Sequence, residues 1–116
     1  MTLDKLVRAL ELTVINLGSG VSLPEKEFNG VYAGDFLSRA MSHVHFDELW
    51  ITIMNNRNVI AVASLTDCAA VILAENVELL PEAFEAAVEN GITVLGSGKS
   101  VYELCVAVHE LTLRDE

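Results

Sequence analysis

The spacing of hydrophobic residues changes along the chain and predicts an alternation of helices and strands. Residues 3–10 carry apolar side chains every three or four positions behind Thr2, a residue type that caps helices, and so predict a short amphipathic helix. Residues 11–16 (ELTVIN) predict a strand, and residues 30–33 predict a second, shorter one. Glycines, a proline and several charged residues predict a loop over residues 17–29.

A helix is expected after the second strand and should end near His43. Asp35 stands directly before it, where an N-cap is needed, and its side chain can accept hydrogen bonds from the first free N–H groups. The predicted apolar face consists of Phe36, Leu37, Ala40 and Met41.

From Leu49 onwards the chain repeats a unit of strand, polar loop and helix three times. The strands are short apolar runs typical of strands buried on both faces, at residues 49–54, 70–74 and 92–95. Such alternation is typical of right-handed βα units. We therefore expect an α/β fold, a compact sandwich with a mostly parallel sheet built from βα units, in which these three strands are neighbours.

The helices of the repeated unit differ in how clearly the sequence defines them. Residues 58–66 are rich in β-branched side chains and favour a strand by propensity, but a helix is expected because the chain must reverse between two strands. The next helix should begin at Pro81 and stop at Gly91. Its predicted apolar face consists of Ala83, Phe84, Ala87 and Val88.

The last predicted helix, residues 100–113, is apolar on nearly all sides. One stripe consists of Val101, Leu104, Cys105, Val108 and Leu111, and Tyr102 and Val106 widen it. A helix of this kind can bury one face in its own domain and another against a second copy.

Composition supports the expectation of a second copy. The 116 residues are enough for one domain, so residues 1–116 are expected to form a single domain. Hydrophobic residues make up 52% of the chain, more than a domain of this size can bury. An apolar surface patch usually packs against a partner. A homodimer whose interface includes Tyr102 and Val106 is therefore expected.

The charge of the chain excludes several classes of partner. With 17 acidic and 7 basic residues the net charge is −10, which repels nucleic acid and anionic membranes. The longest apolar stretch, residues 59–74, is interrupted and too short to span a membrane. The N-terminus lacks the pattern of a signal peptide, so a cytoplasmic location is expected. Cys68 and Cys105 are predicted to be buried, reduced thiols.

A glycine-rich string between a predicted strand and a predicted helix is similar to the end of a phosphate-binding loop. It consists of Gly96, Ser97, Gly98, Lys99 and Ser100. The first glycine of that motif is replaced by Thr93, and 16 residues after Ser100 do not complete a nucleotide triphosphatase. One interpretation is a tight turn with Ser100 as N-cap, and the other is a phosphate site without hydrolysis.

Other polar residues follow the first two strands of the repeat and should meet this string at the carboxyl edge of the sheet. They are Asn55, Asn56, Arg57, Asn58, Glu75 and Asn76. Arg57 and Lys99 could attract the phosphate of a metabolite or nucleotide there, or Arg57 could pair with Glu75 instead. Asparagines also serve as turn and cap residues without any ligand.

The histidines give little support to a metal site. His43 and His45 have a spacing that can chelate a metal, but no third ligand lies nearby in the sequence. His109 has no serine or cysteine nucleophile beside it and is expected at the surface. No metal and no cofactor are predicted.

Three segments of the chain resemble the DRTGG domain family: residues 30–38 (GVYAGDFLS), 50–53 (WITI) and 58–64 (NVIAVAS). The resemblance covers the whole chain. Of the residues that name the family, only Arg57 is matched, because Asn56 replaces the acidic residue and Glu75–Asn76 replaces the glycines.

The resemblance implies a fold similar to the N-terminal domain of HPr kinase/phosphorylase and to a regulatory segment of phosphotransacetylase, and such domains often accompany CBS domains. It also implies regulation or assembly rather than catalysis. We therefore expect a non-catalytic regulatory or assembly module that senses a phosphate-bearing metabolite or nucleotide. The alternative is a small nucleotide- or phosphate-dependent enzyme that uses the loop Gly96–Ser100.

Overall fold

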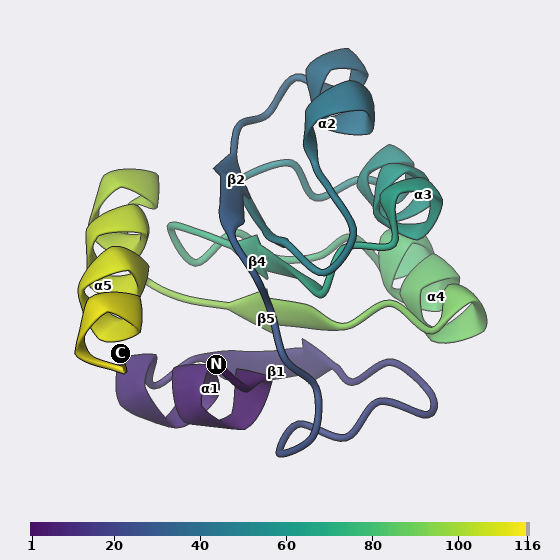
Figure 1. Cartoon of the computed structure of the whole chain (residues 1–116). Coiled ribbons are helices and arrows are strands. Elements are labelled where there is room, and N and C mark those ends of the chain that lie inside the picture. Colours follow the sequence, from purple (N-terminus) through teal and green to yellow (C-terminus); the bar gives the residue numbers. More distant parts are fainter. Residues whose placement is uncertain (116) are drawn as a thin grey trace.

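The computed structural model describes residues 1–115 and has helices and strands in near-regular alternation (Figure 1). The helices are α1 (Leu3–Leu10), α2 (Leu37–His43), α3 (Arg57–Thr66), α4 (Pro81–Asn90) and α5 (Val101–Arg114). The strands are β1 (Thr13–Asn16), β2 (Val31–Ala33), β3 (Leu49–Thr52), β4 (Ala70–Leu73) and β5 (Val94–Gly96).

The strands form one sheet in the order β1-β5-β4-β3-β2. All neighbouring strands are parallel except β1, which is antiparallel to β5. The expected mostly parallel α/β sheet is therefore confirmed, and so is the adjacency of the three strands of the repeated unit. Residues 57–66 form helix α3, as the need to reverse the chain predicts.

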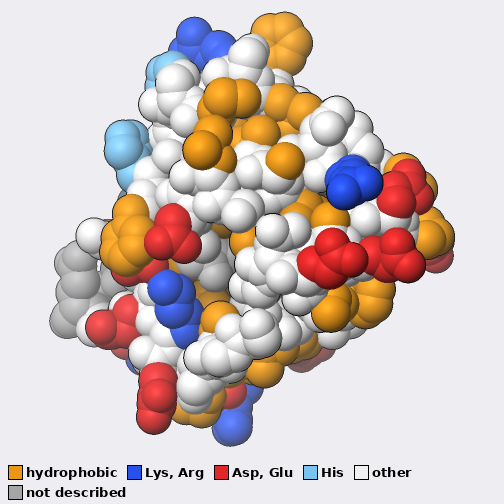
Figure 2. Space-filling view, turned by 90° about the vertical axis from the view of Figure 1, so that its right-hand side faces the viewer, with side chains coloured by type: hydrophobic (Ala, Val, Ile, Leu, Met, Phe, Trp, Pro, Cys, Tyr) orange, Lys and Arg blue, Asp and Glu red, His pale blue; other side chains and the backbone are white. Residues whose placement is uncertain are grey.

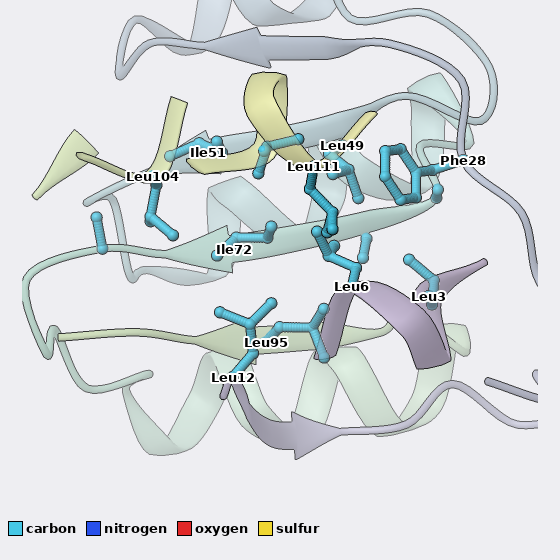
Figure 3. Packing of buried hydrophobic residues seen from close by; sticks show 14 residues of the cluster. Leu3, Leu6, Leu12, Phe28, Leu49, Ile51, Ile72, Leu95, Leu104 and Leu111 are labelled. Atoms are coloured by element: carbon cyan, nitrogen blue, oxygen red, sulfur yellow. The ribbon is translucent and has the colours of Figure 1, made fainter. Parts of the chain in front are cut away.

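Helices cover both faces of the sheet (Figure 1). On one face, α1 and α5 pack on the central strands, and Figure 3 shows Leu6 and Leu104 converging on Ile72 and Leu95. On the other face, α2, α3 and α4 cover a second cluster around the fully buried Trp50. The strands β3, β4 and β5 are buried at every position, which explains why their sequences are continuous apolar runs.

The prediction that Asp35 caps α2 is wrong. Phe36 occupies the N-cap position and makes no side-chain hydrogen bond there. The Asp35 carboxylate instead accepts hydrogen bonds from Thr52 Oγ1 (2.7 Å) and from the Ile53 backbone N–H (3.0 Å). Thr52 is fully buried, so its hydroxyl needs a partner, and Asp35 supplies it while joining the end of β2 to the end of β3.

The predicted apolar faces of α2 and α4 are only partly correct. In α2 the only buried residue is Ala40, and Figure 2 shows hydrophobic side chains exposed on the upper part of the molecule, where α2 lies. In α4 the buried residues are Ala83, Ala86 and Ala87. Small alanines let α4 approach α3 and the sheet closely, whereas Phe84 and Val88 stay 41% and 51% exposed.

The ends of two predicted elements shift because helix caps use their residues. Glu11 has a left-handed conformation (φ 53°) as the C-cap of α1, so β1 starts at Thr13 rather than at residue 11. Gly91 stops α4 as predicted, with φ 66°, and the next N–H, of Ile92, donates to Ala87 O. Strand β5 therefore starts at Val94 rather than at residue 92.

The two cysteines are free thiols, as predicted, but each is half-buried rather than buried. Burial raises the pKa of the Cys68 thiol to about 12. Because the thiolate is the reactive form, very little of the Cys68 side chain is in its reactive form near neutral pH.

Candidate functional site

The loops after β3, β4 and β5 lie side by side at the carboxyl edge of the sheet. The loop after β4 bonds to the loop after β5 through Asn76 N–H to Ser97 O and Glu75 N–H to Lys99 O, both 2.9 Å. The same loop bonds to the end of β3 through Asn55 Nδ2, which donates to Glu78 O at 2.7 Å. The segment that follows β4 therefore connects all three loops.

A tight turn starts this connecting segment. Glu75 and Asn76 both have positive φ, 59° and 57°, and Val77 N–H donates to Ala74 O at 3.1 Å, as in a type I′ turn. Left-handed backbone is costly for a residue such as Glu75, and the hydrogen bonds to the neighbouring loop hold it in place. The turn brings the Asn76 amide against Gly98, where an added Cβ would lie 3.1 Å from Nδ2.

A pocket of about 700 Å³ opens beside this turn, between α4 and the strands β1 and β5. Its apolar wall consists of Ile15, Val77, Leu79, Pro81 and Phe84. Its polar part consists of Thr13, Asn76, Gly96, Ser97 and Gly98, and its acidic part consists of Glu11, Glu78 and Glu85. The volume and the mixture of an apolar wall with a few polar groups are typical of small-molecule sites.

The pocket gathers four of the site residues expected from the sequence: Asn76, Gly96, Ser97 and Gly98. The others lie outside its lining. The Asn55 side chain joins the loop after β3 to the loop after β4 by donating to Glu78 O. Asn56 caps α3 by accepting from the N–H groups of Asn58 and Val59. Arg57, Asn58, Glu75 and Lys99 are exposed, and no ion pair joins Arg57 to Glu75.

The N-terminus of α5 already holds an anion from its own chain. Ser100 Oγ accepts from Glu103 N–H (3.1 Å), and the Glu103 carboxylate accepts from Ser100 N–H (3.0 Å). Lys99 N–H donates to Ser97 Oγ at 3.1 Å. The N–H groups that a phosphate-binding loop would offer at Lys99 and Ser100 are thus engaged, and this geometry fits the tight turn with Ser100 as N-cap.

The capping box predicts a local dependence on pH. The hydrogen bonds from Ser100 lower the pKa of the Glu103 carboxyl below its ordinary value. Because the folded pKa is lowered, the contribution to stability is complete above the ordinary Glu pKa of about 4.3 and is lost as pH falls through the folded pKa. In a Ser100→Ala variant, a carbon-detected NMR titration should give a higher Glu103 pKa than in the wild type. Alanine keeps the backbone N–H of residue 100, which lowers the pKa most, so an unchanged pKa would contradict a contribution of the Ser100 hydroxyl only.

Several residues of the pocket were not predicted as site residues, because the sequence contains only weak indications of their place. Thr13 and Ile15 enter the wall because β1 lies antiparallel beside β5, a pairing that the sequence does not specify. Phe84 was assigned to the core of α4, and only its exposure reveals it as a wall of the pocket. The alternation of Thr13 and Ile15 on one strand face was the one signal available.

The histidines lie outside this pocket. Both His43 and His45 are exposed: His43 contacts Arg39 and Ser42, and His45 Nδ1 lies 3.4 Å from Glu48 Oε1. His109 is exposed, as predicted. Across residues 1–115, no group of three or more His, Cys, Asp or Glu side chains is placed to hold a metal ion. No helix in that range is long and apolar enough to cross a membrane.

Comparisons with known proteins give one informative result. No protein-family model matches the chain, and no curated protein is similar to it in sequence. Its fold is similar to the crystal structure of the CBS and DRTGG domains of the regulatory region of Clostridium perfringens pyrophosphatase, complexed with the activator diadenosine tetraphosphate. The TM-score is 0.73 at 15% identity, over 92% of this chain and 45% of that chain. The chain thus has a DRTGG-like fold and spans a little under half of its neighbour.

Proposed function

We propose that this chain is a non-catalytic regulatory or assembly module that binds a nucleotide in the pocket at the carboxyl edge of its sheet. The observation that carries the proposal is the pocket itself, built by the turn after β4 and the loop after β5. Parallel α/β sheets bind their ligands at this edge. The structural neighbour supports the ligand class, since it is a regulatory region in complex with an activator nucleotide.

The lining of the pocket suits a nucleotide. Phe84 lines the pocket and is 41% exposed, so we expect its ring to provide a surface for stacking on a base. Leu79 and Ile15 extend the apolar surface around it. Asn76 and Ser97 add an amide and a hydroxyl that can exchange hydrogen bonds with a base edge or a sugar.

A regulatory role is favoured over the alternative of a phosphate-dependent enzyme. That alternative needs the N–H groups of the loop Gly96–Ser100 for a phosphate, and two of them bond within the loop and its cap. We also propose a cytoplasmic location, in which the free thiols of Cys68 and Cys105 stay reduced. ATP hydrolysis that a Lys99→Ala substitution abolishes would contradict the proposal.

The test of ligand binding is a thermal-shift panel of nucleosides and nucleotides. A ligand present at a hundred times its dissociation constant adds about 2.7 kcal/mol to the free energy of unfolding, which a rise in melting temperature reports. At least one member of the adenosine series should give this rise. A panel in which no nucleoside or nucleotide shifts the melting temperature would contradict the proposed function.

The assembly part of the proposal is a homodimer formed through α5. Tyr102, Val106, His109 and Leu113 follow one another at intervals of four, three and four residues, so they form one stripe along the helix. All four are exposed, and Tyr102 is 77% exposed. Two such stripes can pack against each other around a two-fold axis, as in an antiparallel helix pair.

A Val106→Glu substitution is expected to convert the homodimer into a monomer, because it buries like charges at the two-fold axis. Light scattering coupled to size-exclusion chromatography measures the change in mass. The matched control is Leu65→Glu, which places the same charge on α3, on the opposite side of the sheet, where Leu65 is 68% exposed. The control should remain a dimer. A wild-type protein that is monomeric at micromolar concentration would contradict this part.

A further inference from the structure

The pocket at the carboxyl edge carries negative charge and no positive charge in its lining. Glu11, Glu78 and Glu85 line it, and no lysine, arginine or histidine does. None of the three carboxylates forms an ion pair within residues 1–115. The chain around them has a net charge of −10. The charged residues of the lining are therefore all acidic, and their carboxylates would repel a phosphate group placed beside them.

The fold brings these three glutamates to one pocket from different elements. Glu11 is the C-cap of α1 in a left-handed conformation, two residues before β1 begins at Thr13. The carbonyl of Glu78 accepts a hydrogen bond from Asn55, which holds the loop between β4 and α4. Glu85 follows Phe84 in α4, and both residues line the pocket. The acidic residues of the lining thus come from three different parts of the chain: the end of α1, the loop between β4 and α4, and α4 itself.

We infer that this pocket takes the uncharged base-and-sugar part of a nucleotide and leaves its phosphate groups outside in solvent. The inference rests on the proposed function and specifies how that site recognises its ligand. Carboxylates only accept hydrogen bonds, and the exocyclic amine of adenine and the hydroxyls of ribose donate them. The acidic lining therefore suits the base and sugar of the ligand, which are uncharged and rich in donors. Phe84 and Leu79 provide the apolar contacts to the base.

The test is calorimetric titration of the full chain with adenosine, AMP and magnesium-free ATP at low and at high salt. Adenosine should bind at least as tightly as ATP, with a dissociation constant that does not change with salt. Salt screens the repulsion between carboxylates and phosphates, so ATP should bind more tightly as the salt concentration rises. This dependence is opposite in sign to that of a phosphate-binding site.

A charge-neutralising pair of variants adds a matched control. Glu85→Gln should tighten ATP binding relative to adenosine by roughly two- to fivefold, the range expected for one exposed charge. Glu82→Gln removes the same charge from the same helix at an exposed position outside the lining, and should leave the ratio unchanged.

The outcomes separate this inference from the proposed function. ATP binding that is tenfold tighter than adenosine binding, or that weakens with salt, overturns the inference and leaves the proposed function standing. An unchanged ratio in Glu85→Gln also overturns it. If adenosine, AMP and ATP all fail to bind, both the inference and the proposed function fall.

Discussion

A Thr13→Trp variant is expected to lose the stabilisation that adenosine gives to the wild-type protein. Thr13 is exposed on β1 and lines the pocket opposite α4, so an indole at this position fills the space that a base would occupy. The wild type should gain about 2.7 kcal/mol at a ligand concentration a hundred times its dissociation constant, and the variant close to none. The fold should persist, because tryptophan is well tolerated in strands. Thermal unfolding with and without adenosine measures both effects.

The matched control for this variant is Val14→Trp. Successive side chains of a strand point to opposite faces, and Val14 is outside the lining of the pocket, although Thr13 and Ile15 are in it. Val14 is 39% exposed, so the new indole has room. The control should respond to adenosine as the wild type does. If Thr13→Trp also responds like the wild type, the ligand does not bind in this pocket.

A Trp50→Ala variant is expected to lose about 3–5 kcal/mol of stability, the range for removing a large aromatic side chain from a core. Trp50 is fully buried on β3, and its indole N–H donates to Gly34 O at 2.9 Å. Small domains have about 5–15 kcal/mol of total stability, so a loss of this size removes most of the stability of a domain at the low end of that range. Urea unfolding followed by circular dichroism measures the loss, since Trp50 is the chain's one tryptophan and its fluorescence disappears with it.

A Trp50→Phe variant separates packing from hydrogen bonding at this position. It keeps an aromatic ring in the core and removes the donor to Gly34 O, so the loss should be smaller, about 1–3 kcal/mol. Equal losses in the alanine and phenylalanine variants would mean that the hydrogen bond, and not the buried area, dominates. That result would contradict the packing account of the cluster on the α2–α4 side.

Much of the fold could be predicted because it follows from local patterns. Strands buried on both faces need continuous apolar runs, and residues 49–52 and 70–73 are such runs. A parallel pair needs a crossover, which makes α3 a helix although its residues favour a strand. The caps at Ser100 and Gly91 follow from the chemistry of single residues. Each of these features depends on residues close together in the sequence or on the crossover that two parallel strands require.

The features that could not be predicted depend on contacts between distant segments. The antiparallel pairing of β1 with β5 joins residues about 80 positions apart, for example Thr13 with Gly96. Asp35 bonds to Thr52 instead of capping α2 because a fully buried hydroxyl needed an acceptor. Helix α4 packs closely on α3 and the sheet through alanines, so these residues are buried and Phe84 stays at the surface. No pattern within one segment specifies such choices.

The candidate site also has features that could be predicted from the sequence and features that could not. Topology alone predicted that the loops after β3, β4 and β5 meet at one edge, which the bonds of Asn76 and Asn55 bear out. The walls of the pocket could not be predicted, because they come from β1 and from the exposed side of α4. The acidic lining depends on the same placement. The edge of the sheet at which the pocket opens could therefore be predicted from the sequence, whereas the acidic charge of its lining could not.

Binding of a nucleotide in the pocket between α4 and the strands β1 and β5 is tested most directly by an NMR titration of the labelled protein with adenosine. The amide shifts report where the ligand binds. Perturbations should cluster around Thr13, the segment 76–79, Phe84 and the glycine-rich loop 96–98, which line the pocket. Perturbations confined to the loop of residues 17–29, or to the groove between β2 and α5 lined by Val31 and His109, would contradict binding in this pocket.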